Sequence, residues 1–222
     1  MSRWKSVRLV LGLLAAGSIA AAAYALAGDD AKKDVKGDGK PAAAQAAASD
    51  KADQAKETEA WMALAKPGKE HEAMKKMEGE YDVEVEVVMQ PGAPPVKSTG
   101  KQTSKMMMGG RYLHSDYTGE MMGMPFHGAS LTGYDNATKK HFSAWIDDMG
   151  TGIMLAKGTA SPDGKVVTLL GEYDDPMTNQ KHKYRWVTTF VTDDKYTFDW
   201  LDADKDGKNE YRMLHNTYTR VK

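Results

Sequence analysis

The sequence contains no cysteine among its 222 residues. This absence excludes disulfide bonds, thiolate zinc sites, a thiol nucleophile and a lipid-modified cysteine near the N-terminus. Outside the N-terminus there is no block of lysine and arginine, and the net charge is −1, so nucleic acid is not an expected partner. The chain also lacks a Gly-x-Ser-x-Gly motif and a glycine-rich phosphate loop. No pattern indicates a cofactor, and no catalytic residue is assigned.

The first 27 residues have the order of a secretory signal peptide. Arg3, Lys5 and Arg8 precede an apolar run over residues 9–26, and Ala25-Leu26-Ala27 is a small-x-small cleavage pattern. An uncleaved anchor is the alternative, because a membrane span needs roughly 20 apolar residues. Both interpretations predict an exported, periplasmic or secreted protein. Membrane contact is expected only through this segment, if it stays uncleaved.

Residues 28–57 are predicted to form a disordered spacer. The stretch consists mostly of Ala, Lys, Asp, Gly and Gln. Between Gly28 and Lys56, Val35 is the single branched aliphatic residue. Such a segment buries too little apolar surface to offset the entropy lost on ordering. The alanine content of residues 42–56 favours transient helix. The folded domain is therefore expected to span residues 58–222.

A short helical entry is predicted at the start of this domain. Trp61 and Leu64 have helical spacing, and Pro67-Gly68 breaks the pattern. Residues 69–78 give a second short amphipathic helix before the stop at Gly79. A helix in this position often covers one end of a sheet.

After Gly79 the apolar pattern alternates with a period of two, which is typical of half-buried strands. Turn-forming pairs such as Gly109-Gly110 and Asp193-Asp194 separate the segments. We expect ten strands, at about residues 81–87, 96–107, 111–120, 125–134, 139–147, 153–161, 165–173, 181–192, 195–202 and 210–220. The short connections predict sequential antiparallel pairing. The fold class is therefore all-β, an up-and-down barrel without open edges, with a two-sheet sandwich as the alternative.

In most strands one phase of the alternation collects large rings. Eight strands already enclose room for one small ligand, and ten enclose more. The candidate ligand-binding residues on this phase, with one polar side chain to orient a ligand, are Met124, Phe126, Tyr134, Trp145, Asp147, Trp186 and Trp200. The alternative is that the rings simply fill the core.

Histidine and methionine do not form a convincing metal site. His114 and His127 lie on adjacent predicted strands and could approach each other, but no His-x-His or His-Glu-x-x-His motif occurs. Met106–Met108 and Met121–Met124 are methionine-rich. Clustered thioethers can bind Cu(I), yet adaptable apolar filling of a barrel mouth is the common use of methionine. No metal ligand is assigned.

Several motifs together resemble a bacterial family known as domain of unknown function 1579. They include residues 67–71, Gly79-Glu80-Tyr81, residues 121–128, residues 145–152 and, further along, residues 133–135, 171–176 and 218–220. The resemblance covers about residues 60–222. It implies a lipocalin-like, calycin-type β-barrel, and it implies no activity and no catalytic residue.

Three functions remain open at this point. The first is a binding module for a small, largely apolar molecule held inside the barrel. The second is an enzyme of unknown class that uses Asp147 with His141 or His215 in the interior. The third is a structural or interaction protein with a filled core. The sequence predicts neither the ligand nor the oligomeric state.

Overall fold

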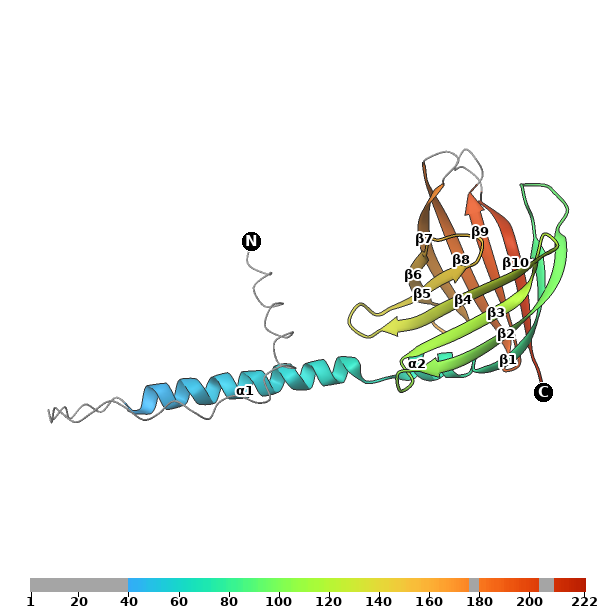
Figure 1. Ribbon diagram of the computed structural model, residues 1–222. Coiled ribbons are helices and arrows are strands. Elements are labelled where there is room, and N and C mark those ends of the chain that lie inside the picture. The colour runs from blue at the N-terminus through green and yellow to red at the C-terminus, as the bar shows by residue number, and fades with distance from the viewer. Residues whose placement is uncertain (1–39, 176–179, 204–209) are drawn as a thin grey trace, which may run out of the picture. The chain divides into compact units, whose positions relative to one another are not determined.

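The computed structural model describes residues 40–175, 180–203 and 210–222 (Figure 1). Residues 51–222 form one compact unit. It holds the end of the first helix, the second helix and the strands that follow. The predicted signal peptide and residues 28–39 of the predicted spacer lie outside the described residues.

Helix α1 (Lys40–Ala65) begins inside the segment for which the sequence predicts a disordered spacer. Residues 40–57 are helical here, in the segment where the sequence predicts a spacer with transient helix over residues 42–56. The reason lies in composition, since alanine has the highest helix propensity of all residues and is the commonest residue here. The helix ends before Pro67-Gly68, as the sequence predicts. Within the described residues, no helix combines the length and apolar character that crossing a membrane requires.

Helix α2 (Lys69–Lys75) is a short helix that packs against the strands. At its N-terminus, the backbone N–H of Gly68 donates to Nδ1 of His71 at 3.0 Å. His71 and Met74 are buried, and the His71 ring meets the Tyr134 ring edge-on with centroids 5.9 Å apart. The predicted helix that covers one end of the sheet is therefore present.

Ten described strands follow α2, close to the predicted positions. Their bounds are β1 (Gly79–Val87), β2 (Val96–Met107), β3 (Tyr112–Met121), β4 (Met124–Asp135), β5 (Lys140–Asp147), β6 (Met154–Ala160), β7 (Val166–Asp175), β8 (Gln180–Thr192), β9 (Lys195–Ala203) and β10 (Glu210–Arg220). Each strand pairs antiparallel with the next along the chain, and β10 pairs with β1 (Figure 1). The prediction of a closed up-and-down barrel is confirmed, and the sandwich is excluded.

The tight turn between β3 and β4 follows from its two central residues. Met122 has a φ of 53° and Gly123 a φ of 77°, while Met121 and Met124 pair in register on either side. Two consecutive positive φ angles are the signature of the type I′ turn, whose twist suits a two-residue hairpin. This turn places the methionine-rich segment at one end of the barrel.

The inward phase of the strands forms two buried clusters. One is centred on β1, with Tyr81, Val83 and Val85, and extends to rings of neighbouring strands. The other contains Leu169 and Trp186 on β7 and β8. Side chains therefore fill part of the interior, and members of both clusters border the space that remains open.

Candidate binding cavity

The barrel encloses a cavity of about 930 Å³. Ligand pockets for small molecules usually have volumes of roughly 300–1,000 Å³, so the space is large enough for a ligand. Ala73 and Met74 of α2 border it at one end, which we call the helix end. Met89, Met122 and Met149 border it at the other, the methionine end, where all three side chains are exposed.

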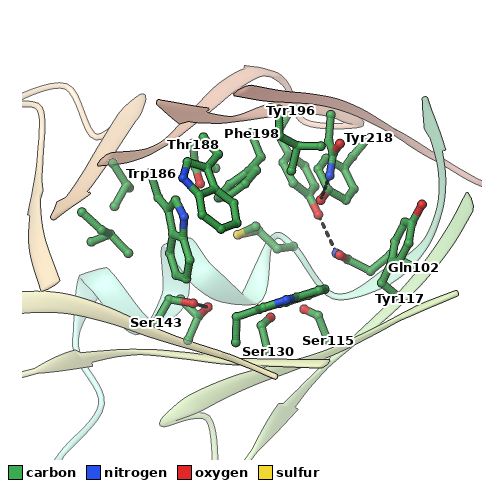
Figure 2. A pocket seen from close by; sticks show the side chains of 18 of the residues that line it. Gln102, Ser115, Tyr117, Ser130, Ser143, Trp186, Thr188, Tyr196, Phe198 and Tyr218 are labelled. Atoms are coloured by element: carbon green, nitrogen blue, oxygen red, sulfur yellow. Dashed lines mark hydrogen bonds between the residues drawn. The ribbon is translucent and has the colours of Figure 1, made fainter. Parts of the chain in front are cut away.

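Two opposite walls of the cavity differ in chemistry (Figure 2). One carries small hydroxyl side chains, and we call it the serine face, formed by Ser115, Ser130 and Ser143 on β3, β4 and β5. The other is the aromatic face, formed by Trp186, Tyr196, Phe198 and Tyr218 on β8, β9 and β10. A ligand between the faces would meet rings on one side and hydrogen-bonding groups on the other.

A chain of buried hydrogen bonds runs along the wall from the aromatic face to the serine face. Nε2 of Gln102 donates to the Tyr196 hydroxyl at 2.8 Å and to Oγ of Ser104 at 3.0 Å. Oγ of Ser104 lies 2.8 Å from Oγ of Ser115. Gln102, Ser104 and Ser115 are each less than 8% exposed. Because buried polar groups are costly when unpaired, this chain holds the polar wall in place.

The tyrosines of the aromatic face are held as neutral hydroxyls. The rings of Tyr196 and Tyr218 stack with centroids 4.3 Å apart, and Nδ2 of Asn216 donates to the Tyr218 hydroxyl at 3.0 Å. Burial raises the pKa of Tyr218 to about 12 and that of Tyr196 well above its ordinary value. Both side chains therefore offer uncharged hydroxyls near neutral pH.

Trp145 and Asp147 form a fixed pair near the methionine end. Nε1 of Trp145 donates to Oδ2 of Asp147 at 2.7 Å, and the backbone N–H of Met149 donates to Oδ1 at 3.0 Å. Both carboxylate oxygens thus have protein donors. The hydrogen bond to Asp147 holds the Trp145 indole ring in place at the edge of the cavity.

A family model described as "Protein of unknown function (DUF1579)" matches residues 66–220. The chain belongs to this family. The resemblance found in the sequence motifs is therefore confirmed. No functionally curated protein has a sequence that matches the chain.

Two solved structures share the barrel of this DUF1579 protein. Rv2717c from M. tuberculosis has a TM-score of 0.51 and 12% identity, over 71% of this chain and 100% of that one. The S-type phycobiliprotein lyase CPES from Guillardia theta has a TM-score of 0.50 and 11% identity, over 68% of this chain and 92% of that one. At such low identities the likeness shows the fold alone.

Most of the predicted ligand-binding residues of the DUF1579 barrel lie together around the cavity. The predicted residues that border the cavity are Phe126, Trp145, Asp147, Trp186 and Trp200. They come from β4, β5, β8 and β9, so the closed barrel brings together side chains from distant parts of the sequence. Whether they bind a ligand stays a prediction.

Met124 and Tyr134 are the two predicted residues that do not border the cavity. Met124 follows the type I′ turn directly and is 49% exposed. Tyr134 shares the inward phase, but it lies at the far end of β4, where its ring contacts the rings of His71 and His141. Strand alternation alone does not reveal which inward residues reach the middle of a barrel.

The predicted site lacks the serine face and α2, which the structure adds to it. Ser130 and Thr132 have the same phase as Phe126, and Ser143 has the same phase as Trp145. Counting polar as well as aromatic residues on that phase would have found them. Nothing in the sequence pattern indicates that Met74 borders the cavity, because this depends on where α2 packs.

The histidines do not combine with acids inside the cavity. His141 borders it, and burial lowers the pKa of that imidazole. The predicted approach of His114 and His127 is observed at Asp116, at 3.2 and 3.6 Å, where all three side chains are at least 38% exposed. Among the described residues, no three His, Cys, Asp or Glu side chains are arranged to hold a metal ion.

One short contact joins a histidine and an acid outside the cavity lining. Nδ1 of His215 lies 2.7 Å from Oδ1 of Asp199. Neither residue borders the cavity, whereas their strand neighbours Leu214, Asn216 and Phe198 do. The pair therefore lies on the opposite phase, on the outer face of the barrel.

Proposed function

We propose that this protein binds a small, largely apolar molecule inside its barrel. The observation that carries the proposal is the 930 Å³ cavity between the serine and aromatic faces. Burial of apolar ligand surface against such a wall gives roughly 25 cal/mol per Å². A protein with a filled core would not retain an interior space of this size.

The structure favours binding over the enzymatic alternative. An acid–histidine pair is the simplest general acid–base arrangement that the sequence could supply. Both carboxylate oxygens of Asp147 already accept hydrogen bonds, from Nε1 of Trp145 and from the backbone N–H of Met149. The described His215–Asp199 pair does not border the cavity. The side chains that border the cavity, on the serine and aromatic faces, offer apolar contacts and hydrogen bonds to a bound molecule.

The proposal is tested by titrating the protein with N-phenylnaphthylamine, an uncharged apolar dye that fluoresces in dry surroundings. Ser130→Phe places a large ring in the cavity, opposite Trp186 (Figure 2). We expect the dye affinity to fall by about tenfold or more, equivalent to ~1.4 kcal/mol. Leu131→Phe is the matched control, because Leu131 is the next residue on β4 and is 37% exposed.

Unchanged dye affinity in Ser130→Phe, or equal loss in both variants, would contradict binding inside the barrel. Near-ultraviolet circular dichroism checks that both variants keep their tertiary packing. If Ser130→Phe does not fold, Thr188→Phe tests the same space from the opposite wall.

We further propose that binding takes place outside the cytoplasm, on the basis of the N-terminal residues. N-terminal sequencing of protein recovered from the periplasm or medium should give a chain that starts at Gly28 after the Ala25-Leu26-Ala27 pattern. Recovery of the intact chain from the cytoplasm alone would contradict export.

A further inference from the structure

Ser115 and Ser130 are cross-strand neighbours, and both border the cavity. Ser104, Ser115 and Ser130 are direct cross-strand neighbours on β2, β3 and β4. Adjacent strands lie roughly 4.8 Å apart, so the three hydroxyl side chains form one row across the wall. Figure 2 shows Ser115 and Ser130 side by side on the wall opposite the aromatic face.

Hydrogen bonds link two of the three serines of this row to Gln102. Gln102 donates to Oγ of Ser104 at 3.0 Å, and Oγ of Ser104 lies 2.8 Å from Oγ of Ser115, a hydrogen bond in which either hydroxyl can be the donor. When Ser104 is the donor, the Ser115 proton is left for a group in the cavity. Ser130 makes no side-chain hydrogen bond within the described residues. The row therefore ends at Ser130, whose hydroxyl borders the cavity, with the Ser115 hydroxyl next to it.

The charged groups around the cavity disfavour an anionic ligand. Among the described residues, the cavity lining includes no arginine, and its lysines are largely solvated, with side chains 90% exposed for Lys69 and 72% for Lys97. Lys97 is also paired with Glu86 at 2.8 Å. A carboxylate next to the serine row would be buried without a cation, which is far more costly than burying an uncharged oxygen.

The aromatic face sets the shape of the ligand. Trp186 and Phe198 have ring centroids 5.9 Å apart, and Tyr196 and Tyr218 are stacked. Rings prefer offset or edge contacts with other rings at such distances. The wall therefore favours a flat ring system over a flexible acyl chain, which would lose more rotational freedom on binding.

We propose that Ser115 and Ser130 form a hydroxyl pair that donates to a carbonyl oxygen on a flat, uncharged ligand whose rings lie against the aromatic face. The inference rests on the proposed function, because it assumes that the cavity takes a ligand. It adds the chemical class of that ligand and the residues that recognise its oxygen.

Three probes with one skeleton separate the alternatives: methyl naphthyl ketone, ethylnaphthalene and naphthoate. They differ in the group that would meet the serine row, a neutral carbonyl, a hydrocarbon or a carboxylate. We expect Ser130→Ala to lower the ratio of ketone affinity to ethylnaphthalene affinity by about three- to tenfold, since a hydrogen bond to an uncharged group has that worth. Using a ratio cancels the different solubilities of the probes in water.

A spectroscopic readout tests the contact itself. The infrared band of a carbon-13-labelled ketone carbonyl shifts to lower frequency when the oxygen accepts hydrogen bonds. We expect this shift in the native protein, a smaller shift in Ser130→Ala, and recovery in Ser130→Thr, which restores the hydroxyl. Thr118→Ala is the control, because it removes an exposed hydroxyl from the neighbouring strand β3.

The outcomes distinguish the two proposals. If none of the three probes binds, the proposed function fails. A second outcome is that Ser130→Ala leaves the ratio of ketone affinity to ethylnaphthalene affinity unchanged, and a third is that the carbonyl band matches that in a hydrocarbon solvent. Either of these results would show that the cavity binds ligands but that the serine pair does not donate a hydrogen bond to the ligand oxygen. Tighter binding of naphthoate than of the ketone would overturn the requirement for an uncharged ligand.

Discussion

Gly128 shows how the absence of one Cβ atom shapes the cavity wall. A Cβ built at this position would lie 2.2 Å from Cζ2 of Trp145. The indole ring therefore lies directly against the β4 backbone, in the position from which its N–H reaches Asp147. A similar arrangement occurs at Gly133, where the added Cβ would lie 2.3 Å from the Phe142 ring. Glycine in these strands makes room for a neighbouring ring.

Gly128→Ala should therefore displace the Trp145 ring and lower the free energy of unfolding by about 1–3 kcal/mol, the usual cost of overpacking. Urea unfolding followed by circular dichroism measures this change. Gly152→Ala is the matched control, since nothing lies within 4 Å of its added Cβ and its φ is not in the left-handed region. Equal effects of the two substitutions would contradict the packing described here.

His141 makes stability depend on pH. Burial lowers the pKa of this imidazole below its ordinary value of 6.5, so between the two values the unfolded chain binds more protons than the folded one. The stability that the neutral ring contributes is complete above pH 6.5 and is lost as the pH falls towards the lower folded pKa.

Replacing the imidazole by a ring that does not titrate should remove this part of the pH dependence. Between about pH 7.5 and about pH 5, the unfolding free energy of the native protein should fall more steeply than that of His141→Phe. Chemical unfolding at several pH values gives both slopes. Parallel slopes would show that His141 does not titrate differently in the folded state.

At the scale of elements, Arg220 joins the end of β10 to two other parts of the barrel. Its guanidinium donates to the backbone carbonyls of Lys76 and Glu78, which precede β1. It also donates to Oδ1 of Asp194, in the turn between β8 and β9, at 3.0 Å. The same group lies 4.9 Å from the centre of the Tyr81 ring. One side chain thus stabilises the seam where β1 and β10 close the barrel.

Arg220→Lys should destabilise the protein by about 1.5–3 kcal/mol, because an ammonium cannot reproduce the fork of donors. Amide hydrogen exchange should accelerate first in β1 and β10. Arg212→Lys is the control on the same strand, where the arginine makes a single 3.4 Å contact with Asp199 and is 53% exposed. If both substitutions have the same small effect, Arg220 does not hold the seam.

At the scale of the whole molecule, closure of the sheet turns a repeated two-residue pattern into a two-faced cavity. The serine face comes from β3 to β5 and the aromatic face from β8 to β10, so they are separated along the chain. They meet across the interior only because β1 pairs with β10. The outer surface carries apolar side chains too, including Leu155 at 56% and Leu170 at 62% exposure.

The strands and their closure could be predicted from the sequence because alternation and short turns are local signals. Phe126, Trp145 and Trp186 could be placed inside for the same reason. The position of Tyr134 at a strand end and the contact of Met74 with the cavity depend on three-dimensional packing. The helix at residues 40–57 shows a different limit, since alanine-rich segments carry helix propensity without an apolar face.

The most direct test of the central claim is to locate a bound apolar molecule by nuclear Overhauser effects. Protein with labelled leucine and valine methyl groups is mixed with N-phenylnaphthylamine. The dye protons should show cross-peaks to Val85, Leu113 and Leu169, which border the cavity. Cross-peaks confined to Leu155, Leu170 and Val191, which are exposed, would place the dye on the outer surface and contradict binding inside the barrel.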